Sequence, residues 1–338
     1  MTAPMAPAAS IDLKAPGKRI GHIELVWSDD AHAYGVIPVP IVAIVGGSGP
    51  TALVTAGVHG DEYEGLVIAR SLAARLEPGD LAGRLIVMPA LNWPAVEARA
   101  RTSPIDRQNL NRAFPGGSDG PTALIAAFVE GLLPEIDIAV DLHSGGTQSI
   151  YTPCGYVYAM GSPAFRARKL AAAHAFGAPV TAVVAATASS GSLSGACERH
   201  GVPMVATELG GGARLDRAAQ AIGEAGTLNL LRHAGVLHGA PVPTRTAFRH
   251  TPSRRAHVMA PIDGLAETVV APGETVEAGQ LVARVWPTDD LARPPVEVRF
   301  AEAGMVMAVR TMPMVKRGDT LCHTGVPMSD DDFLGVGR

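Results

Sequence analysis

Short apolar runs alternate with amphipathic, alanine-rich segments between about residue 50 and residue 240. The apolar runs have the length and β-branched content of buried strands, and the segments between them are typical of helices. The clearest strand candidates are residues 51–58, 84–91, 136–143 and 202–209. The clearest helix candidates are residues 66–75, 124–136 and 162–177. Such alternation predicts the α/β class, with a mainly parallel sheet and helices packed on both of its faces.

The two ends of the chain have a different pattern. Residues 20–50, which include the run IPVPIVAIVGG, predict an additional strand or hairpin at the edge of the sheet. Proline and arginine interrupt the helical pattern between Gly239 and Ala260 and predict a linker. We therefore expect a larger domain over residues 1–245 and a small all-β domain over residues 255–330.

The expected second domain contains an internal repeat. Gly264 is followed by LAETVVAPGETVEAGQL and Gly304 by MVMAVRTMPMVKRGDTL, and Gly279 and Gly318 lie near the ends of the two halves. The repeat predicts a barrel sandwich of two similar hairpin units, and it resembles lipoyl and biotinyl carrier domains. Those carriers present a modified lysine between the halves, whereas residues 284–300 contain none. We expect a structural domain, or a rim to the functional site, without carrier function.

Composition narrows the functional classes. The 338 residues are 47% hydrophobic and 18% charged, which allows a large core and two domains. A net charge of -4, with no basic stripe carrying interleaved aromatic residues, argues against nucleic acid as a partner. No apolar run approaches the roughly 18 residues that cross a membrane. In the N-terminal segment the basic residues do not precede the apolar ones, as they do in a signal peptide. The chain has three scattered cysteines, Cys154, Cys197 and Cys322, which indicate no disulfide framework. We therefore expect the protein to be cytoplasmic.

A histidine and a glutamate lie three positions apart in GVHGDEYEG, where the first strand candidate ends. Zinc binds imidazole and carboxylate, and a catalytic zinc site uses three protein ligands. Alone, His59 and Glu62 would more often belong to a surface loop. His143 has the same setting at the end of another strand candidate, and ligands of an open α/β sheet bind at the carboxyl ends of its strands. We therefore expect His59, Glu62 and His143 to form one metal site.

Asp141 precedes His143 by two residues, so the two side chains share one face of the expected strand. A carboxylate there could orient the imidazole of a metal ligand. It could equally cap the loop that follows. The sequence does not decide between these two roles.

Two arginines and a glutamate have chemistry that suits such a site. Arg112, in NLNRAFPG, can grip a carboxylate in a bidentate manner, and Arg101 can stabilise an oxyanion, although both could be solvated loop charges. Glu208 ends an apolar run and precedes three glycines. A carboxylate at the end of a buried strand is costly unless it is paired or used. Glu208 is therefore a candidate general base, with a bond to a helix N-terminus as the alternative.

The ordered set of His59-x-x-Glu62, NLNRAFPG, DLHSGG and TELGGG resembles the succinylglutamate desuccinylase/aspartoacylase family, which is similar to the zinc carboxypeptidases. The resemblance covers most of residues 20–330. It implies a zinc-carboxypeptidase-like mixed sheet with flanking helices, and an amidohydrolase with one zinc per subunit that removes an acyl group by means of zinc-activated water. It implies that His59, Glu62 and His143 bind the zinc. Glu208 is the implied general base, and Asn111 with Arg112 is the implied carboxylate-binding pair. Arg101 is a less secure match, because the loop around it varies in length.

Within that family, RTSPIDRQNLNRAFPG and the lipoyl-like tail are most similar to the N-acetyl-diaminobutyrate deacetylases of ectoine degradation. One free guanidinium at Arg112 suits one carboxylate, and Asp61, Glu64 and Asp106 are acids in or beside the motif loops that could face an ammonium group. We therefore expect N-acetyl-L-2,4-diaminobutyrate as the substrate. The alternative is an acidic compound such as succinylglutamate or N-acetylaspartate.

Two other functional classes fit less well. Residues 116–120 match the G-x-S-x-G pattern of serine hydrolases, but the flanking Phe-Pro and Gly-Pro do not provide the required strand, turn and helix. A non-catalytic binding protein would not need the full set of catalytic groups. The expected partner is a small N-acyl amino acid, with no nucleic acid or membrane, and assembly into a homo-oligomer is left open.

Overall fold

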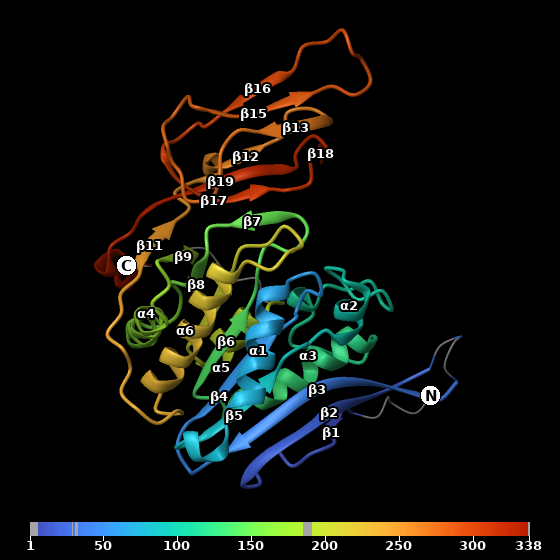
Figure 1. Ribbon diagram of the computed structural model, residues 1–338, viewed down its shortest axis with the longest axis vertical. Helices are drawn as coiled ribbons and strands as arrows, with labels where there is room; N and C mark the ends of the chain where they lie inside the picture. The colour runs from blue at the N-terminus through green and yellow to red at the C-terminus, as the bar shows by residue number, and fades with distance from the viewer. Residues whose placement is uncertain (1–5, 29, 31–32, 185–190, 337–338) are drawn as a thin grey trace.

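A computed structural model describes residues 6–28, 30, 33–184 and 191–336. Its main body is a large mixed sheet with helices on both faces, and a smaller β unit extends from one end (Figure 1). The strands of the main body are β1 (Ala8–Ala9), β2 (Gly17–Trp27), β3 (Gly35–Val45), β4 (Thr51–Ala56), β5 (Arg84–Met88), β6 (Ile138–Leu142), β7 (Ser149–Tyr151), β8 (Cys154–Tyr158), β9 (Val180–Val184), β10 (Met204–Glu208) and β11 (Ala247–His250). The α-helices are α1 (Tyr63–Arg75), α2 (Trp93–Ala98), α3 (Pro121–Leu132), α4 (Pro163–Phe176), α5 (Leu193–His200), α6 (Arg217–His233) and α7 (Asp330–Gly335). Short 3₁₀ turns are η1 (Pro78–Asp80), η2 (Leu110–Arg112), η3 (Leu133–Glu135) and η4 (Arg254–Ala256).

The main sheet has the strand order β1-β2-β3-β5-β4-β6-β10-β8-β9-β11. Its centre is parallel, because β5, β4, β6 and β10 run in one direction, and every residue of β4 and β6 is buried. The near-continuous apolar sequence of these strands follows from helices that cover both faces. The predicted edge hairpin is confirmed as β2 and β3. The sheet is less uniformly parallel than the alternation predicts, because β8 is antiparallel to β10 and β3 is antiparallel to β5.

The helices form two layers, each with its own apolar core. One core joins the sheet to α1, α4, α6 and α7 through residues such as Ile68, Phe176 and Leu230. The other joins it to α3 and α5 through Ile125 and Leu193. A fully buried side chain of this size contributes roughly 1.5–3 kcal/mol. The central strands are therefore held from both sides, which gives the loops at their ends a rigid base.

Eight strands make up the C-terminal β unit: β12 (His257–Met259), β13 (Gly264–Thr268), β14 (Thr275–Val276), β15 (Leu281–Trp286), β16 (Val296–Arg299), β17 (Gly304–Arg310), β18 (Met314–Val315) and β19 (Thr320–Pro327). Strand β13 pairs with β15 and β18, and β17 pairs with β19 and β14. Each half thus contributes its short strand to the other half, so the repeat in the sequence is also a repeat in strand pairing. Gly279 and Gly318 occupy equivalent turns, where φ values of 83° and 92° favour glycine.

The segment between Gly239 and Ala260 is not only a linker. It contains β11, which lies parallel to β9 and extends the main sheet. Strand β19 pairs with β11 near its C-terminal end and with β12 and β17 along the rest of its length. The linker prediction is wrong at β11, because hydrogen bonding to β9, and not a local apolar pattern, makes this segment a strand.

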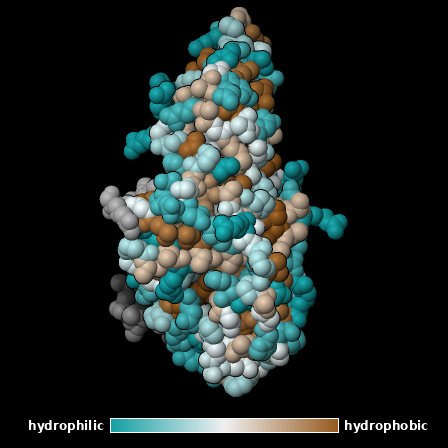
Figure 2. Space-filling model, turned by 90° about the vertical axis from the view of Figure 1, so that its left-hand side faces the viewer, coloured by the Kyte–Doolittle hydropathy of each residue, from teal (hydrophilic) through white to brown (hydrophobic). Residues whose placement is uncertain are grey.

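The surface view in Figure 2 shows apolar residues scattered among polar ones over the face that it presents. Such scattering is ordinary for a folded protein. Among the described residues, no helix combines the length and the apolar character needed to span a membrane.

Candidate metal and catalytic site

The expected metal ligands lie in loops at the carboxyl ends of two neighbouring parallel strands. His59 and Glu62 lie between β4 and α1, and His143 directly follows β6. Ala56 is paired with Leu142 at the ends of these strands, which places the two loops side by side. All three side chains are buried.

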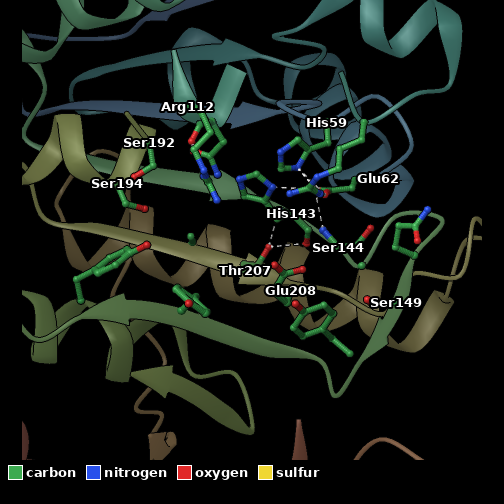
Figure 3. A pocket seen from close by; sticks show the side chains of 18 residues that line it. His59, Glu62, Arg112, His143, Ser144, Ser149, Ser192, Ser194, Thr207 and Glu208 are labelled. Carbon is green, nitrogen blue, oxygen red and sulfur yellow. Dashed lines mark hydrogen bonds and ion pairs between the residues drawn. The ribbon is translucent and has the colours of Figure 1, made fainter. Parts of the chain in front are cut away.

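The three side chains converge on one point, as Figure 3 shows. Nδ1 of His59 lies 2.6 Å from Oε1 of Glu62, and Nδ1 of His143 lies 2.7 Å from Oε2. One potential ligand atom from each residue lies within 4.8 Å of the others, so the group could hold a metal ion. Two imidazoles and one carboxylate match the ligand set of many catalytic zinc sites.

The outer nitrogen of each imidazole is held by an oxygen. Nε2 of His143 lies 2.8 Å from Oδ2 of Asp141, and Nε2 of His59 lies 3.1 Å from Oδ1 of Asn109. The other oxygen of Asp141 accepts a hydrogen bond from Oγ1 of Thr55 at 2.7 Å. Histidines that bind metals usually have their second nitrogen held in this way. Of the two roles left open for Asp141, the structure therefore shows the orienting one, and both Nδ1 atoms remain directed at Glu62.

The charge on Glu62 is stabilised by its neighbours. Burial opposes its ionisation, but His143 and His59 outweigh that effect and lower the pKa of the carboxyl well below its usual range. The guanidinium of Arg101 also lies beside this carboxylate, with Nη1 at 3.4 Å from Oε1 of Glu62. The Arg101 side chain is 48% exposed, so it reaches the site from the solvent side.

Glu208 ends β10, the strand next to β6, and its side chain enters the same cavity (Figure 3). Its Oε2 atom is buried and has no hydrogen-bond partner among the described residues. Burial, followed by the charge of Glu62, raises the pKa of Glu208 to about 8. A carboxyl with this pKa can both accept and release a proton near neutral pH.

These groups share a cavity of about 350 Å³. Arg112, on η2, lies at the end of the cavity away from Glu62, near Ser192 and Ser194 (Figure 3). Asn111 also lines the cavity, and its Oδ1 accepts a hydrogen bond from the backbone N–H of Leu193, which ties the Arg112 segment to the start of α5. The structure thus brings all seven expected site residues to one cavity: His59, Glu62, Arg101, Asn111, Arg112, His143 and Glu208.

Several residues of the site have no signal in the sequence. Tyr151, Tyr156 and Tyr158 line the cavity from β7 and β8, two strands without a strong apolar pattern. Thr207 holds the His143 backbone, since its Oγ1 accepts from the N–H at 3.0 Å and donates to the C=O at 3.1 Å. Asn109 and Thr207 could have been found, because they lie inside the NLNRAFPG and TELGGG motifs.

The acids suggested as partners of a substrate ammonium group have other roles. Asp61, Glu64 and Asp106 do not line the cavity. The carboxylate of each accepts a backbone N–H from another segment, respectively that of Thr147, Asp216 and Thr122. The suggestion was wrong because these side chains connect loops instead of facing the cavity. Ser118, from the serine hydrolase alternative, is exposed and also lies outside it.

The C-terminal β unit supports one wall of the cavity. Strand β17 pairs with β7, so that Ala308 lies opposite Tyr151. Thr311, just after β17, donates its hydroxyl to the carbonyl of Thr147 and its N–H to the carbonyl of Gln148 at 3.0 Å. Gln148 and Tyr151 both line the cavity. Of the two expected roles for this region, a rim to the site is therefore the one that the contacts support.

Fold and site together define a member of the succinylglutamate desuccinylase/aspartoacylase family, and the chain belongs to it: the family's catalytic domain model matches residues 48–234. N-alpha-acetyl-L-2,4-diaminobutyric acid deacetylase of Halomonas elongata is 38% identical over 322 residues, which cover 94% of each chain. The product-bound structure of the ectoine utilization protein EutE (DoeB) from Ruegeria pomeroyi is 40% identical, with a TM-score of 0.91 and coverage of 96% of this chain and 100% of that chain. A succinylglutamate desuccinylase/aspartoacylase from Rhodobacter sphaeroides is 35% identical, with a TM-score of 0.90 and coverage of 96% and 100%.

Proposed function

We propose that the protein hydrolyses N-acetyl-L-2,4-diaminobutyrate to acetate and L-2,4-diaminobutyrate. The observation that carries this proposal is the meeting of a His-Glu-His group, a buried carboxyl and two arginines in one cavity. The similarity to the Halomonas elongata deacetylase over 94% of both chains supports this choice of substrate.

The proposed cofactor is one zinc ion per subunit, held by His59, Glu62 and His143. The donor set suits zinc, and both imidazoles are already oriented by Asp141 and Asn109. When bound, the metal would polarise the acyl carbonyl and lower the pKa of a water molecule.

Glu208 is the proposed general base. It accepts a proton from the attacking water and then delivers that proton to the nitrogen of the leaving amine as the C–N bond breaks. Its raised pKa suits both steps, because the carboxyl must gain and lose a proton within one turnover. Its unpartnered Oε2 is available for this exchange.

The arginines have separate roles in this proposal. Arg112 and Asn111 bind the carboxylate of the substrate at the far end of the cavity, and Oδ1 of Asn111 also ties their segment to the start of α5. Arg101, beside Glu62, stabilises the negative charge that develops on the acyl oxygen.

The lining of the cavity favours a substrate with a single carboxylate. Arg101 and Arg112 are its only arginines, and no lysine lines it among the described residues. A second acidic group, as in succinylglutamate or N-acetylaspartate, would lack a cation of its own. An ammonium group would instead meet neutral oxygens, those of Tyr156, Tyr158 and Ser194 among them.

A panel of kcat/KM values on the zinc-loaded enzyme tests this function. The substrates are N-acetyl-L-2,4-diaminobutyrate, N-acetylornithine, N-acetylaspartate and succinylglutamate. We expect the diaminobutyrate compound to give the highest value. A preference for either acidic compound would contradict this substrate but leave the deacylase chemistry standing, and activity that survives complete zinc removal would contradict the metal.

We further infer that residues 1–245 form the catalytic domain and residues 255–330 a lipoyl-like domain that forms a rim to the site and has no carrier function. The symmetric strand pairing supports this division, and so does the absence of lysine from residues 284–300. An intact mass equal to the sequence mass is expected. A mass increase located in residues 255–330 would contradict the absence of carrier function.

A further inference from the structure

A second cavity adjoins the candidate active site. It has a volume of about 580 Å³ and lies where β8, β9 and β11 of the main body meet β12, β17 and β19 of the C-terminal unit. Ser149, Tyr151 and Tyr156 line both cavities and therefore form a shared wall. The volume is within the range of small-molecule sites.

The second cavity is lined by basic residues. No aspartate or glutamate is among the described residues that line it. The basic residues of its lining are three arginines and three histidines: Arg249, Arg254, Arg310, His250, His257 and His323. Clefts lined by one sign of charge concentrate ligands of the opposite sign.

Two of the arginines lack acidic partners in the part of the chain that the structure describes. Arg310 pairs with Asp319 at 3.2 Å, which neutralises part of its charge. Arg249 donates only to the carbonyl of Phe248, at 3.1 Å, and neither Arg249 nor Arg254 forms an ion pair with any described carboxylate. Their guanidinium groups are thus free to bind carboxylate or phosphate oxygens in a bidentate manner.

A pair of stacked imidazoles adds further donors. The rings of His257 and His323 lie 5.3 Å apart at 27°, and His323 also meets the edge of Tyr151 at 5.8 Å. Burial and the nearby His257 lower the pKa of His323 to about 4, so this ring is neutral at pH 7 and carries one N–H donor. The contact with Tyr151 connects the imidazole pair to the shared wall.

We infer that this second cavity binds a small anion with two or more negatively charged oxygens, a phosphate or a dicarboxylate, through Arg249 and Arg254. The site is separate from the carboxylate subsite at Arg112, which lines only the first cavity. Neither the metal nor the proposed deacetylase reaction is needed for this binding. Failure of the substrate assignment would therefore leave the inference intact.

Calorimetric titration of the full-length zinc-loaded protein with inorganic phosphate, and separately with succinate, tests the site. We expect Arg249→Gln/Arg254→Gln to weaken binding of the preferred anion at least tenfold. Arg255→Gln is the matched control, because Arg255 is exposed in the same segment and does not line the cavity; it should bind within twofold of the wild type. The two titrations distinguish a phosphate site from a dicarboxylate site.

The variant Arg112→Gln distinguishes anion binding in the second cavity from anion binding in the first. Binding that persists in this variant and is lost on adding the double substitution belongs to the second cavity. Because Arg254 is exposed, Arg254→Gln alone should fold normally and weaken binding severalfold, even if the double variant is unstable. The inference is overturned if the wild type binds neither anion at millimolar concentration, if Arg112→Gln alone abolishes binding, or if both folded arginine variants bind like the wild type.

Discussion

Oδ2 of Asp141 lies 2.8 Å from Nε2 of the imidazole of His143, two residues further along the chain. Side chains two positions apart share one face of a strand, so β6 and its immediate extension bring these groups together. The contact leaves Nδ1 of His143 directed at Glu62, 2.7 Å away. Asp141 therefore positions a proposed metal ligand without being one of the three proposed ligands itself.

Removal of this contact should weaken metal binding without abolishing it. We expect Asp141→Asn to lower zinc affinity about 10- to 100-fold, because the imidazole loses its charged orienting partner. His143→Ala removes a ligand and should cause a severe loss of zinc. Competition with a chelator, followed by metal analysis, measures both effects. Asp137→Asn is the control, since Asp137 holds the backbone at the other end of β6 through Thr51. If His143→Ala keeps a full equivalent of zinc, the metal lies elsewhere.

Glu208→Gln should separate binding from catalysis. Glutamine has nearly the same shape but cannot accept the proton from water, so kcat should fall about 10²- to 10⁴-fold. Zinc content and substrate binding should stay close to those of the wild type. Steady-state kinetics and metal analysis check this, with the exposed Glu97→Gln as the control. Near-normal turnover in Glu208→Gln would remove Glu208 from the mechanism.

Thr311→Val tests whether the C-terminal unit supports the active-site wall. The substitution removes the hydroxyl that binds the Thr147 carbonyl. A typical hydrogen bond contributes about 1 kcal/mol, so we expect KM to rise about fivefold while zinc content is unchanged. Thr275→Val, at an exposed position of β14, is the control. Kinetics identical to those of the wild type would show that the wall holds its shape without this contact.

His323 should make the folded state sensitive to acid. Its pKa is lowered to about 4 in the folded protein, by burial and by His257, compared with about 6.5 for a free imidazole. As the pH falls from 6.5 towards 4, the unfolded chain takes up a proton that the folded protein excludes, so stability decreases. The decrease is at most about 1.4 kcal/mol per pH unit, and above pH 6.5 the effect vanishes.

Urea unfolding at pH 7.5, 6.0 and 5.0 measures this dependence. His323→Gln should lose less stability than the wild type between pH 6.0 and 5.0. The exposed His238→Gln should follow the wild-type curve. Parallel pH dependence of the wild type and His323→Gln would contradict this assignment.

Local pattern was sufficient to predict the central strands and several helices. Residues of β4, β5, β6 and β10 are mostly buried on both faces, so each strand is a continuous apolar run that can be recognised without its neighbours. The convergence of His59, Glu62 and His143 could be predicted for a related reason. They directly follow such strands, and carboxyl ends of parallel strands meet at one edge of a sheet.

Tertiary structure alone decided the tyrosine wall of the site and the second cavity beside it. Strand β7 is three residues long and only partly buried, and it is a strand because β17, more than 150 residues later, pairs with it. Tyr151 enters both cavities for that reason. Arg249 and His323 likewise line one cavity because β19 pairs with β11. Hydrogen bonds and charge clusters between distant segments leave no periodic pattern in a sequence, because strand pairing, and not local hydrophobicity, brings those residues together.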